Sequence, residues 1–91
     1  MLVAVICTDK VDALEVRMAN RDAHLAYIKE TGIVQQAGPF LDALGAMCGS
    51  LVILEVANME DAHDWASNDP YAKAGLFADV RLENWKRVVG A

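Results

Sequence analysis

The sequence predicts an α+β fold of the ferredoxin-like kind, in which one antiparallel sheet carries two helices on a single face. Three observations support this: the order of the elements, two strongly apolar strands, and a long helix without Gly or Pro. The elements follow one another as strand, helix, strand, strand, helix, strand, which is the split βαβ plan. The 91 residues contain no linker, repeat or low-complexity segment, so we expect a single domain over residues 1–91.

The first half of the chain predicts a strand, a long helix and a second strand. Residues 2–7 (LVAVIC) form a short apolar run rich in β-branched residues, which is typical of a buried strand. Residues 11–30 contain no Gly or Pro and are rich in Ala, Leu, Glu and Arg, so they predict a helix that ends at the next glycine. Residues 33–41 (IVQQAGPFL) predict a strand interrupted at Gly38 and Pro39.

The second half begins with a connection at residues 42–49 that contains two glycines. Residues 50–57 (SLVILEVA) are the second strongly apolar strand. An Asn and an acidic first turn indicate a helix over residues 58–68, and residues 76–89 predict the last strand.

The two apolar strands also bear on the face of the sheet that the helices leave bare. A strand with one face in water alternates apolar and polar residues, whereas residues 2–7 and 50–57 are apolar at nearly every position. Hydrophobic residues make up 55% of the chain, which is more than a 91-residue domain can readily bury in its own core. We therefore expect a homodimer through this sheet face, or a higher oligomer built on it.

Charge and composition exclude several kinds of partner. Thirteen acidic and eight basic residues give a net charge of −5, so the protein should repel polyanions and we expect no nucleic-acid partner. The opening MLVAVIC is too short for a signal-peptide core or a membrane span, so we expect no membrane association and a cytoplasmic location. Cys7 and Cys48 form no Cys-x-x-Cys pair, and we expect both to be free.

The long helix predicts the first candidate site residues. On a wheel of about 100° per residue it has an apolar stripe of Leu14, Met18, Leu25 and Ile28. Arg21 falls within this stripe, and Arg17 and His24 lie at its edge. An arginine in a buried stripe must either meet an anion or extend its head to solvent. His24 beside two arginines favours the neutral imidazole, which is a competent general base near pH 7.

Asp69 is the second candidate, and it allows two interpretations. It directly precedes Pro70, so its carboxylate can accept hydrogen bonds from the first N–H groups of a short helix. A carboxylate held in this way is also rigidly aimed. It could orient a histidine base such as His24 and stabilise its charged form.

The remaining polar residues give no sign of a metal or cofactor. His63 lies on a helix face dense in acids, where we expect a surface role, and no His-x-x-x-His spacing is present, so we expect no metal. The segment GAMCGS lacks both the Walker lysine and the dinucleotide pattern, so we expect no nucleotide cofactor. Trp65, Tyr71 and Trp85 are interpreted as core or interface aromatics that could wall an apolar pocket.

Four segments together resemble a known family: RMANRDAHLAYI, AGPF, GSLVILEV and NDPYAKAGLFADVRLENW. An Arg-x-x-His helix, a Gly-Pro, a Gly-Ser before a strand and an Asp-Pro-Tyr followed by Ala-Gly occur in the order typical of the YciI-like (YCII-related) family. That family is a branch of the dimeric α/β-barrel superfamily. The resemblance implies a ferredoxin-like protomer whose sheet packs against its twin, with a pocket between sheet and helices that takes a small-molecule ligand.

The resemblance also implies a site and a chemistry. The family is associated with a His–Asp dyad, which the motifs place at His24 and Asp69. Other recurrent positions line the cleft as substrate-binding residues, namely Arg21, Pro39, Ser50 and Tyr71. Relatives include a cofactor-free enzyme that removes chloride from a chlorinated hydroxyquinol, and the wider superfamily includes muconolactone isomerase.

Two functions from different classes are consistent with these residues. The first is a cofactor-independent lyase, isomerase or dehalogenase-like enzyme acting on a small oxygenated substrate, with aromatic and lactone-like compounds as candidates. His24 would move a proton while Asp69 orients it, Arg21 would bind a carboxylate or phenolate, and Ser50 would donate to an oxyanion. The alternative is a non-catalytic binding or assembly module, in which Asp69 only caps its helix and Arg21 pairs with it or with Glu55. A monooxygenase ranks third, because nothing in the sequence points to oxygen chemistry.

Overall fold

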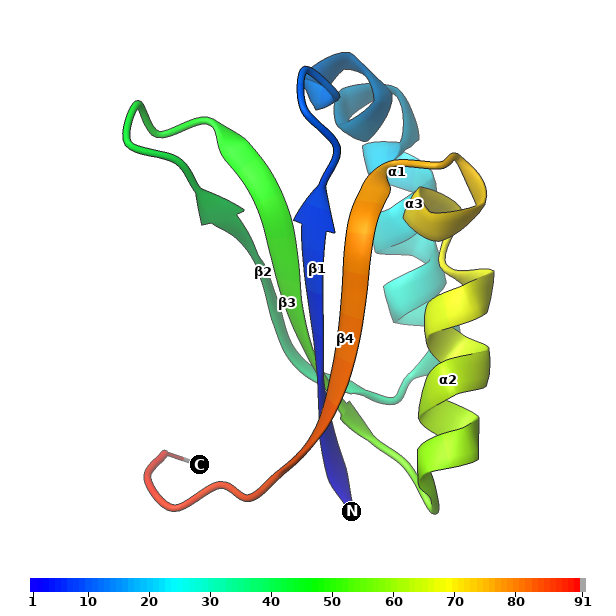
Figure 1. Ribbon diagram of the computed structural model, residues 1–91. Helices are drawn as coiled ribbons and strands as arrows, with labels where there is room; N and C mark the ends of the chain where they lie inside the picture. The colour runs from blue at the N-terminus through cyan, green and yellow to red at the C-terminus, as the bar shows by residue number, and fades with distance from the viewer. Residues whose placement is uncertain (91) are drawn as a thin grey trace.

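Across residues 1–90, which the computed structural model describes, four strands form one antiparallel sheet and three helices lie on one of its faces (Figure 1). In chain order the elements are β1 (Leu2–Asp9), α1 (Leu14–Thr31), β2 (Val34–Leu41), β3 (Met47–Glu55), α2 (Met59–Asn68), α3 (Pro70–Lys73) and β4 (Phe77–Trp85). The strand order is β2-β3-β1-β4, with each neighbouring pair antiparallel. The ferredoxin-like α+β fold predicted from the sequence is therefore confirmed.

The second strand is continuous, so the predicted interruption at Gly38 and Pro39 was wrong. Both residues pair with β3, opposite Leu51 and Ser50. The physical reason is the place of β2 at the edge of the sheet, where only one side of the strand needs N–H groups for the ladder and a proline is tolerated.

Three other boundaries shift by a few residues. The long helix begins at Leu14 instead of residue 11, because residues 11–13 form a turn in which Asp12 has a φ of 57°. The third strand already begins at Met47, inside the predicted connection. The last strand ends at Trp85, four residues before the predicted end.

The core lies between the sheet and the helices. Alternate residues of β1 and β3 point toward the helices and form one core cluster with Ala62 and Trp65 of α2; they are Val3, Val5, Cys7, Val52, Leu54 and, just beyond β3, Val56. Burying each large apolar side chain contributes about 1.5–3 kcal/mol. Both cysteines in the described residues are free, as predicted.

The opposite face of the sheet is also apolar at its centre. Ala4 and Ile53 are buried there by their neighbours, and Ile6 and Leu51 are half-buried. No helix within residues 1–90 covers this face (Figure 1). The two-sided apolar pattern of the central strands thus reflects two apolar faces, of which the helices cover only one.

The C-terminal half of α1 is held against α2 by a closed set of hydrogen bonds. The Tyr27 hydroxyl donates to the Trp65 carbonyl at 2.8 Å, and Trp65 Nε1 donates to Thr31 Oγ1 at 2.9 Å. The Thr31 hydroxyl in turn donates to the Tyr27 carbonyl at 2.9 Å. The helix then ends at Gly32, whose φ of 67° is the left-handed conformation that glycine adopts without strain. These contacts fix the orientation from which the first half of α1 presents its side chains.

Candidate active site

A cavity of about 160 Å³ lies between α1 and the β2–β3 part of the sheet. Its polar lining consists of Arg17, Arg21, His24, Ser50 and Tyr71, and its apolar lining includes Leu25, Ile28, Pro39, Met47 and Val52. All the substrate-binding residues predicted from the sequence therefore border one cavity together with His24. Their functional roles stay predictions.

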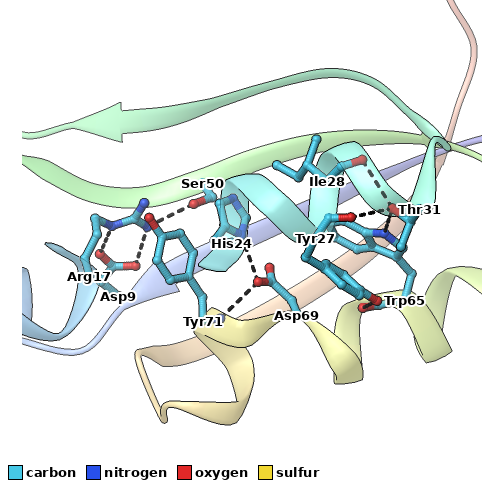
Figure 2. A network of polar contacts seen from close by, with 10 residues as sticks. All are labelled: Asp9, Arg17, His24, Tyr27, Ile28, Thr31, Ser50, Trp65, Asp69 and Tyr71. Carbon is cyan, nitrogen blue, oxygen red and sulfur yellow. Dashed lines mark hydrogen bonds and ion pairs between the residues drawn. The ribbon is translucent and has the colours of Figure 1, made fainter. Parts of the chain in front are cut away.

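His24 lines this cavity, and its ring contacts Asp69, which is not itself a lining residue. Figure 2 shows the two side chains pointing toward one another. His24 Nδ1 lies 2.8 Å from Asp69 Oδ1, and the two residues are only 6% and 3% exposed. The same Oδ1 accepts the Tyr71 N–H at 3.0 Å, where α3 begins with Pro70. One oxygen thus caps the short helix and contacts the histidine, so both interpretations of Asp69 describe the same geometry.

This arrangement determines which imidazole nitrogen is free. An ionised carboxylate can only accept, so Nδ1 of His24 carries the proton that it shares with Asp69. In the neutral ring the lone pair then resides on Nε2, which takes no hydrogen bond from any residue within 1–90. His24 lines the cavity, so a basic nitrogen is available to a bound molecule.

Tyr71 packs flat on the His24 ring. The centroids of the two rings are 4.0 Å apart, with an interplanar angle of 16°. Phe77 contacts the Tyr71 ring edge-on, with 6.1 Å between the ring centroids. Burial raises the pKa of Tyr71 above its ordinary value, although the charges of Arg17 and Arg21 act against this. Tyr71 is therefore a neutral phenol at neutral pH, and it holds the imidazole plane in place.

Arg17 is the site residue that the sequence analysis placed only at a stripe edge. It is 2% exposed and binds Asp9 with two hydrogen bonds of 2.8 Å, from Nε and Nη2. Nη2 also donates to Ser50 Oγ at 2.9 Å, and the guanidinium lies 4.7 Å from the Tyr71 ring centroid (Figure 2). Burial acts against the charge, but the hydrogen bond and charge of Asp9 outweigh it, so the pKa of Arg17 lies above its ordinary value.

The buried apolar stripe predicted on α1 was wrong in its orientation. Leu14, Met18 and Leu25 are about half exposed, and Arg21 is exposed at the cavity instead of buried. The face toward the sheet carries Arg17 and His24, because Asp9 pairs with the guanidinium and Asp69 accepts a hydrogen bond from the imidazole. The available signal was the spacing of Arg17, His24 and Thr31, since residues seven apart lie on one helix face.

The floor of the cavity explains two of the sequence motifs. Pro39 and Ser50 pair across the β2–β3 ladder and both line the cavity. A side chain at Gly49 would collide with the carbonyl oxygen of Cys7, so only glycine allows β3 to approach β1 directly before Ser50. The Gly-Ser and Gly-Pro pairs therefore shape the same wall.

Residues 1–90 contain no group of three or more His, Cys, Asp or Glu side chains arranged to hold a metal ion. None of the helices in this part of the chain is long and apolar enough to span a lipid bilayer.

Comparison with known proteins assigns the fold and the family. The sequence matches the YCII-related domain over residues 1–86. The chain belongs to the YCII-related family. It is 36% identical to protein YciI of Escherichia coli O6:H1 over 97 aligned positions, which cover 97% of this chain and 99% of that protein. An uncharacterized protein of Haemophilus influenzae Rd is 33% identical with the same coverage.

Solved structures extend this comparison. The 5-chloro-2-hydroxyhydroquinone dehydrochlorinase TftG of Burkholderia phenoliruptrix AC1100, in complex with 2,5-dihydroxybenzoquinone, superposes with a TM-score of 0.88. The two chains are 38% identical over 94% of each. An antibiotic biosynthesis monooxygenase superposes with a TM-score of 0.60 at 11% identity over 98% of this chain and all of that one, which concerns the fold alone. This YCII-related chain thus shares the fold of the dimeric α/β barrels.

Proposed function

We propose that this YCII-related protein is an enzyme that performs acid–base chemistry on a small, single-ring, oxygenated substrate without a cofactor. The observation that carries this proposal is the 2.8 Å contact of Asp69 with His24, a residue that lines the cavity and whose second imidazole nitrogen is free. The similarity to a dehydrochlorinase at 38% identity supports the same class of reaction.

In the proposed reaction, Nε2 of His24 takes a proton from a substrate hydroxyl or carbon. Asp69 keeps the ring in the required tautomer and stabilises the imidazolium that forms. In an elimination, the electron pair left on the substrate forms a new double bond, and the leaving group departs with the pair from its bond to carbon. In an isomerisation, His24 returns the proton to a different atom. General acid–base assistance of this kind contributes about 10²–10⁴-fold in rate.

The cavity limits the size of the substrate. Its volume of about 160 Å³ is close to that of apolar protein cavities of about 150 Å³ that accommodate benzene. Its walls combine apolar side chains with a few polar groups, as small-molecule sites do. A single ring with hydroxyl or carbonyl substituents fits both the volume and the lining.

Arg21 supports an anionic substrate. Arg21 lines the cavity and forms no ion pair within residues 1–90, in contrast to Arg17, which pairs with Asp9. A free arginine at a cavity is well suited to a carboxylate or a phenolate. We assign it the role of binding the acidic group of the substrate.

We also propose that a second copy of the chain covers the bare sheet face. That face has an apolar centre of Ala4, Ile6, Leu51 and Ile53, which no helix of residues 1–90 covers. The cavity lies on the opposite, helical side of the sheet, so a dimer formed in this way leaves its entrance open.

The test combines binding with turnover. The purified protein is titrated with 2,5-dihydroxybenzoquinone by calorimetry, and chloride release from 5-chloro-2-hydroxyhydroquinone is followed with an ion-selective electrode. The proposal predicts that the parent protein binds the quinone and releases chloride. It also predicts that the His24→Ala and Asp69→Asn variants fold but no longer release chloride. Folded variants as fast as the parent contradict it, and binding without any turnover in the parent favours the binding module instead.

A further inference from the structure

The Asp9–Arg17 ion pair is buried beside the cavity but is not part of the His24–Asp69 contact. Both side chains are almost fully buried, and neither contacts His24 or Asp69 through a hydrogen bond. A buried ion pair contributes little net stability compared with apolar residues of the same volume, because removing two charges from water is costly. Stability alone therefore does not account for this pair beside the cavity.

The contact of Arg17 with Ser50 indicates a role. Nη2 of Arg17 has two hydrogens, of which one goes to Asp9 and the other to Ser50 Oγ. Oγ thus accepts from a charged donor, and the hydroxyl hydrogen of Ser50 has to point elsewhere. No residue within 1–90 accepts a hydrogen bond from Ser50, and Ser50 lies on the cavity wall.

We propose that Asp9 and Arg17 are positioning residues that turn the Ser50 hydroxyl into a donor aimed at a ligand oxygen in the cavity. Asp9 fixes the guanidinium, and the guanidinium fixes Oγ and draws electron density from it, which makes the O–H a stronger donor. A second ligand oxygen, separate from the acidic group that we assign to Arg21, therefore binds at Ser50, where negative charge on it is stabilised. The inference rests on the proposed function, because it assigns the Ser50 wall of the same cavity to a further oxygen of the ligand.

The geometry of arginine is necessary for this role. Its planar fork binds a carboxylate with two parallel hydrogen bonds and still presents a third donor in a fixed direction. A lysine has the charge, but its three N–H donors share one freely rotating nitrogen and have no fixed directions toward Asp9 and Ser50. Arg17→Lys is thus expected to keep the charge of the site and to lose the orientation of Ser50.

The test needs variants that fold. Arg17→Met alone would leave Asp9 as an unpaired buried charge, so the main variant is Asp9→Ala combined with Arg17→Met, which removes both charges. Ser50→Ala removes the donor itself. Arg81→Met is the matched control, because Arg81 pairs with Glu83 at 3.7 Å on exposed strand β4, away from the cavity.

The first readout needs no ligand. Crystal structures of the parent and of the Asp9→Ala/Arg17→Met protein are compared at Ser50. The proposal predicts that Oγ leaves its position on the cavity wall or occupies more than one rotamer in the double variant, and stays in place in Arg81→Met. A Ser50 side chain that stays in its single position without the pair overturns the proposal.

The second readout is binding of 2,5-dihydroxybenzoquinone in a double-mutant cycle. Ser50→Ala is expected to weaken binding about ten- to a hundredfold, the cost of a hydrogen bond to a charged group. Removing Asp9 and Arg17 is expected to weaken binding similarly in the parent, but by less than about threefold in the Ser50→Ala background. An equal loss in both backgrounds overturns the proposal, since the pair would then not act through Ser50. If the parent does not bind the quinone, the proposed function fails, and the Ser50 position alone decides the inference.

Discussion

The two halves of α1 differ in how their polar groups are satisfied, although both halves face the same protein interior. In the second half, Tyr27, Thr31 and Trp65 form a neutral network in which each donor has an acceptor within the chain. Nearer the N-terminus of the helix, Arg17 and His24 are each held by a carboxylate on one side and face a cavity on the other. Figure 2 shows the two networks side by side along the helix.

This difference separates groups that hold the fold from groups that are available to a ligand. A network that is closed within the chain adds stability, and a change in it is expected to lower the free energy of unfolding. A network with one free nitrogen or hydroxyl at a cavity can bind or react. A change there is expected to act mainly on ligand binding and turnover.

The largest expected effect is at His24. His24→Ala should lower turnover of a substrate by about 10²–10⁴-fold, because the group that accepts the proton is gone. Chloride release from 5-chloro-2-hydroxyhydroquinone measures this, and circular dichroism verifies the fold. His63→Ala on the exposed side of α2 is the matched control and should retain full activity. Equal rates in the two variants would remove His24 from the mechanism.

The closed half of the helix should respond in stability instead. Thr31→Val keeps the shape of the side chain but deprives Trp65 Nε1 of its acceptor, so it should lower the free energy of unfolding by about 1–3 kcal/mol. Urea denaturation measures this, with Thr8→Val on an exposed position of β1 as the control. A Thr31→Val protein as stable as the control would mean that the network contributes nothing.

The sequence alone was sufficient to predict the order of strands and helices. Strands were indicated by the apolar runs at residues 2–7 and 50–57, and the long helix by the glycine-free run at residues 11–30. It also placed Asp69 at a helix start, because Asp before Pro is a local signal. The convergence of His24 with Asp69 came only from the family pattern. Contacts between residues 45 positions apart leave no trace in local propensities.

The orientation of α1 could not be predicted, because the assumption that apolar residues face the sheet fails where charges are neutralised within the structure. Asp9 lies at the end of β1 and gives no sign in the sequence that it meets Arg17. The wheel consequently assigned the buried position to Arg21. Only the fold shows that Arg17 is the enclosed arginine and Arg21 the exposed one.

That distinction leads to an intermediate effect at Arg21. Arg21→Met should weaken binding of 2,5-dihydroxybenzoquinone about tenfold, since one charge-assisted hydrogen bond is lost. The free energy of unfolding should change by less than about 0.5 kcal/mol, because Arg21 is exposed and forms no ion pair in residues 1–90. Calorimetry and urea denaturation give the two values. A loss of stability without a loss of binding would reverse the assignment.

The smallest expected effect appears at alkaline pH. Burial raises the pKa of Tyr27 above its ordinary value of 10.0, so the unfolded chain loses this proton at lower pH than the folded one. The stabilising difference is fully present below pH 10.0 and is lost as the pH rises through the folded-state pKa. Tyr27→Phe should therefore show a shallower alkaline decline of the free energy of unfolding than the parent.

The Tyr27→Phe protein should still lose free energy of unfolding at alkaline pH, because a buried cysteine also titrates there. This shared loss is an internal reference for the comparison with the parent. Burial raises the pKa of the Cys7 thiol from 9.0 to about 12, so both proteins should lose stability above pH 9.0 from this group. Urea denaturation at several pH values resolves the difference between them. Identical slopes for parent and Tyr27→Phe would contradict the assignment to Tyr27.

The most direct test of the account follows the ring nitrogens of the two histidines by ¹⁵N NMR during a titration with 2,5-dihydroxybenzoquinone. We expect a saturable shift of the His24 Nε2 resonance, a smaller change at Nδ1 because it stays bound to Asp69, and no change at His63. His24 resonances that remain unchanged at saturating quinone would contradict the claim that the open side of this dyad faces the ligand.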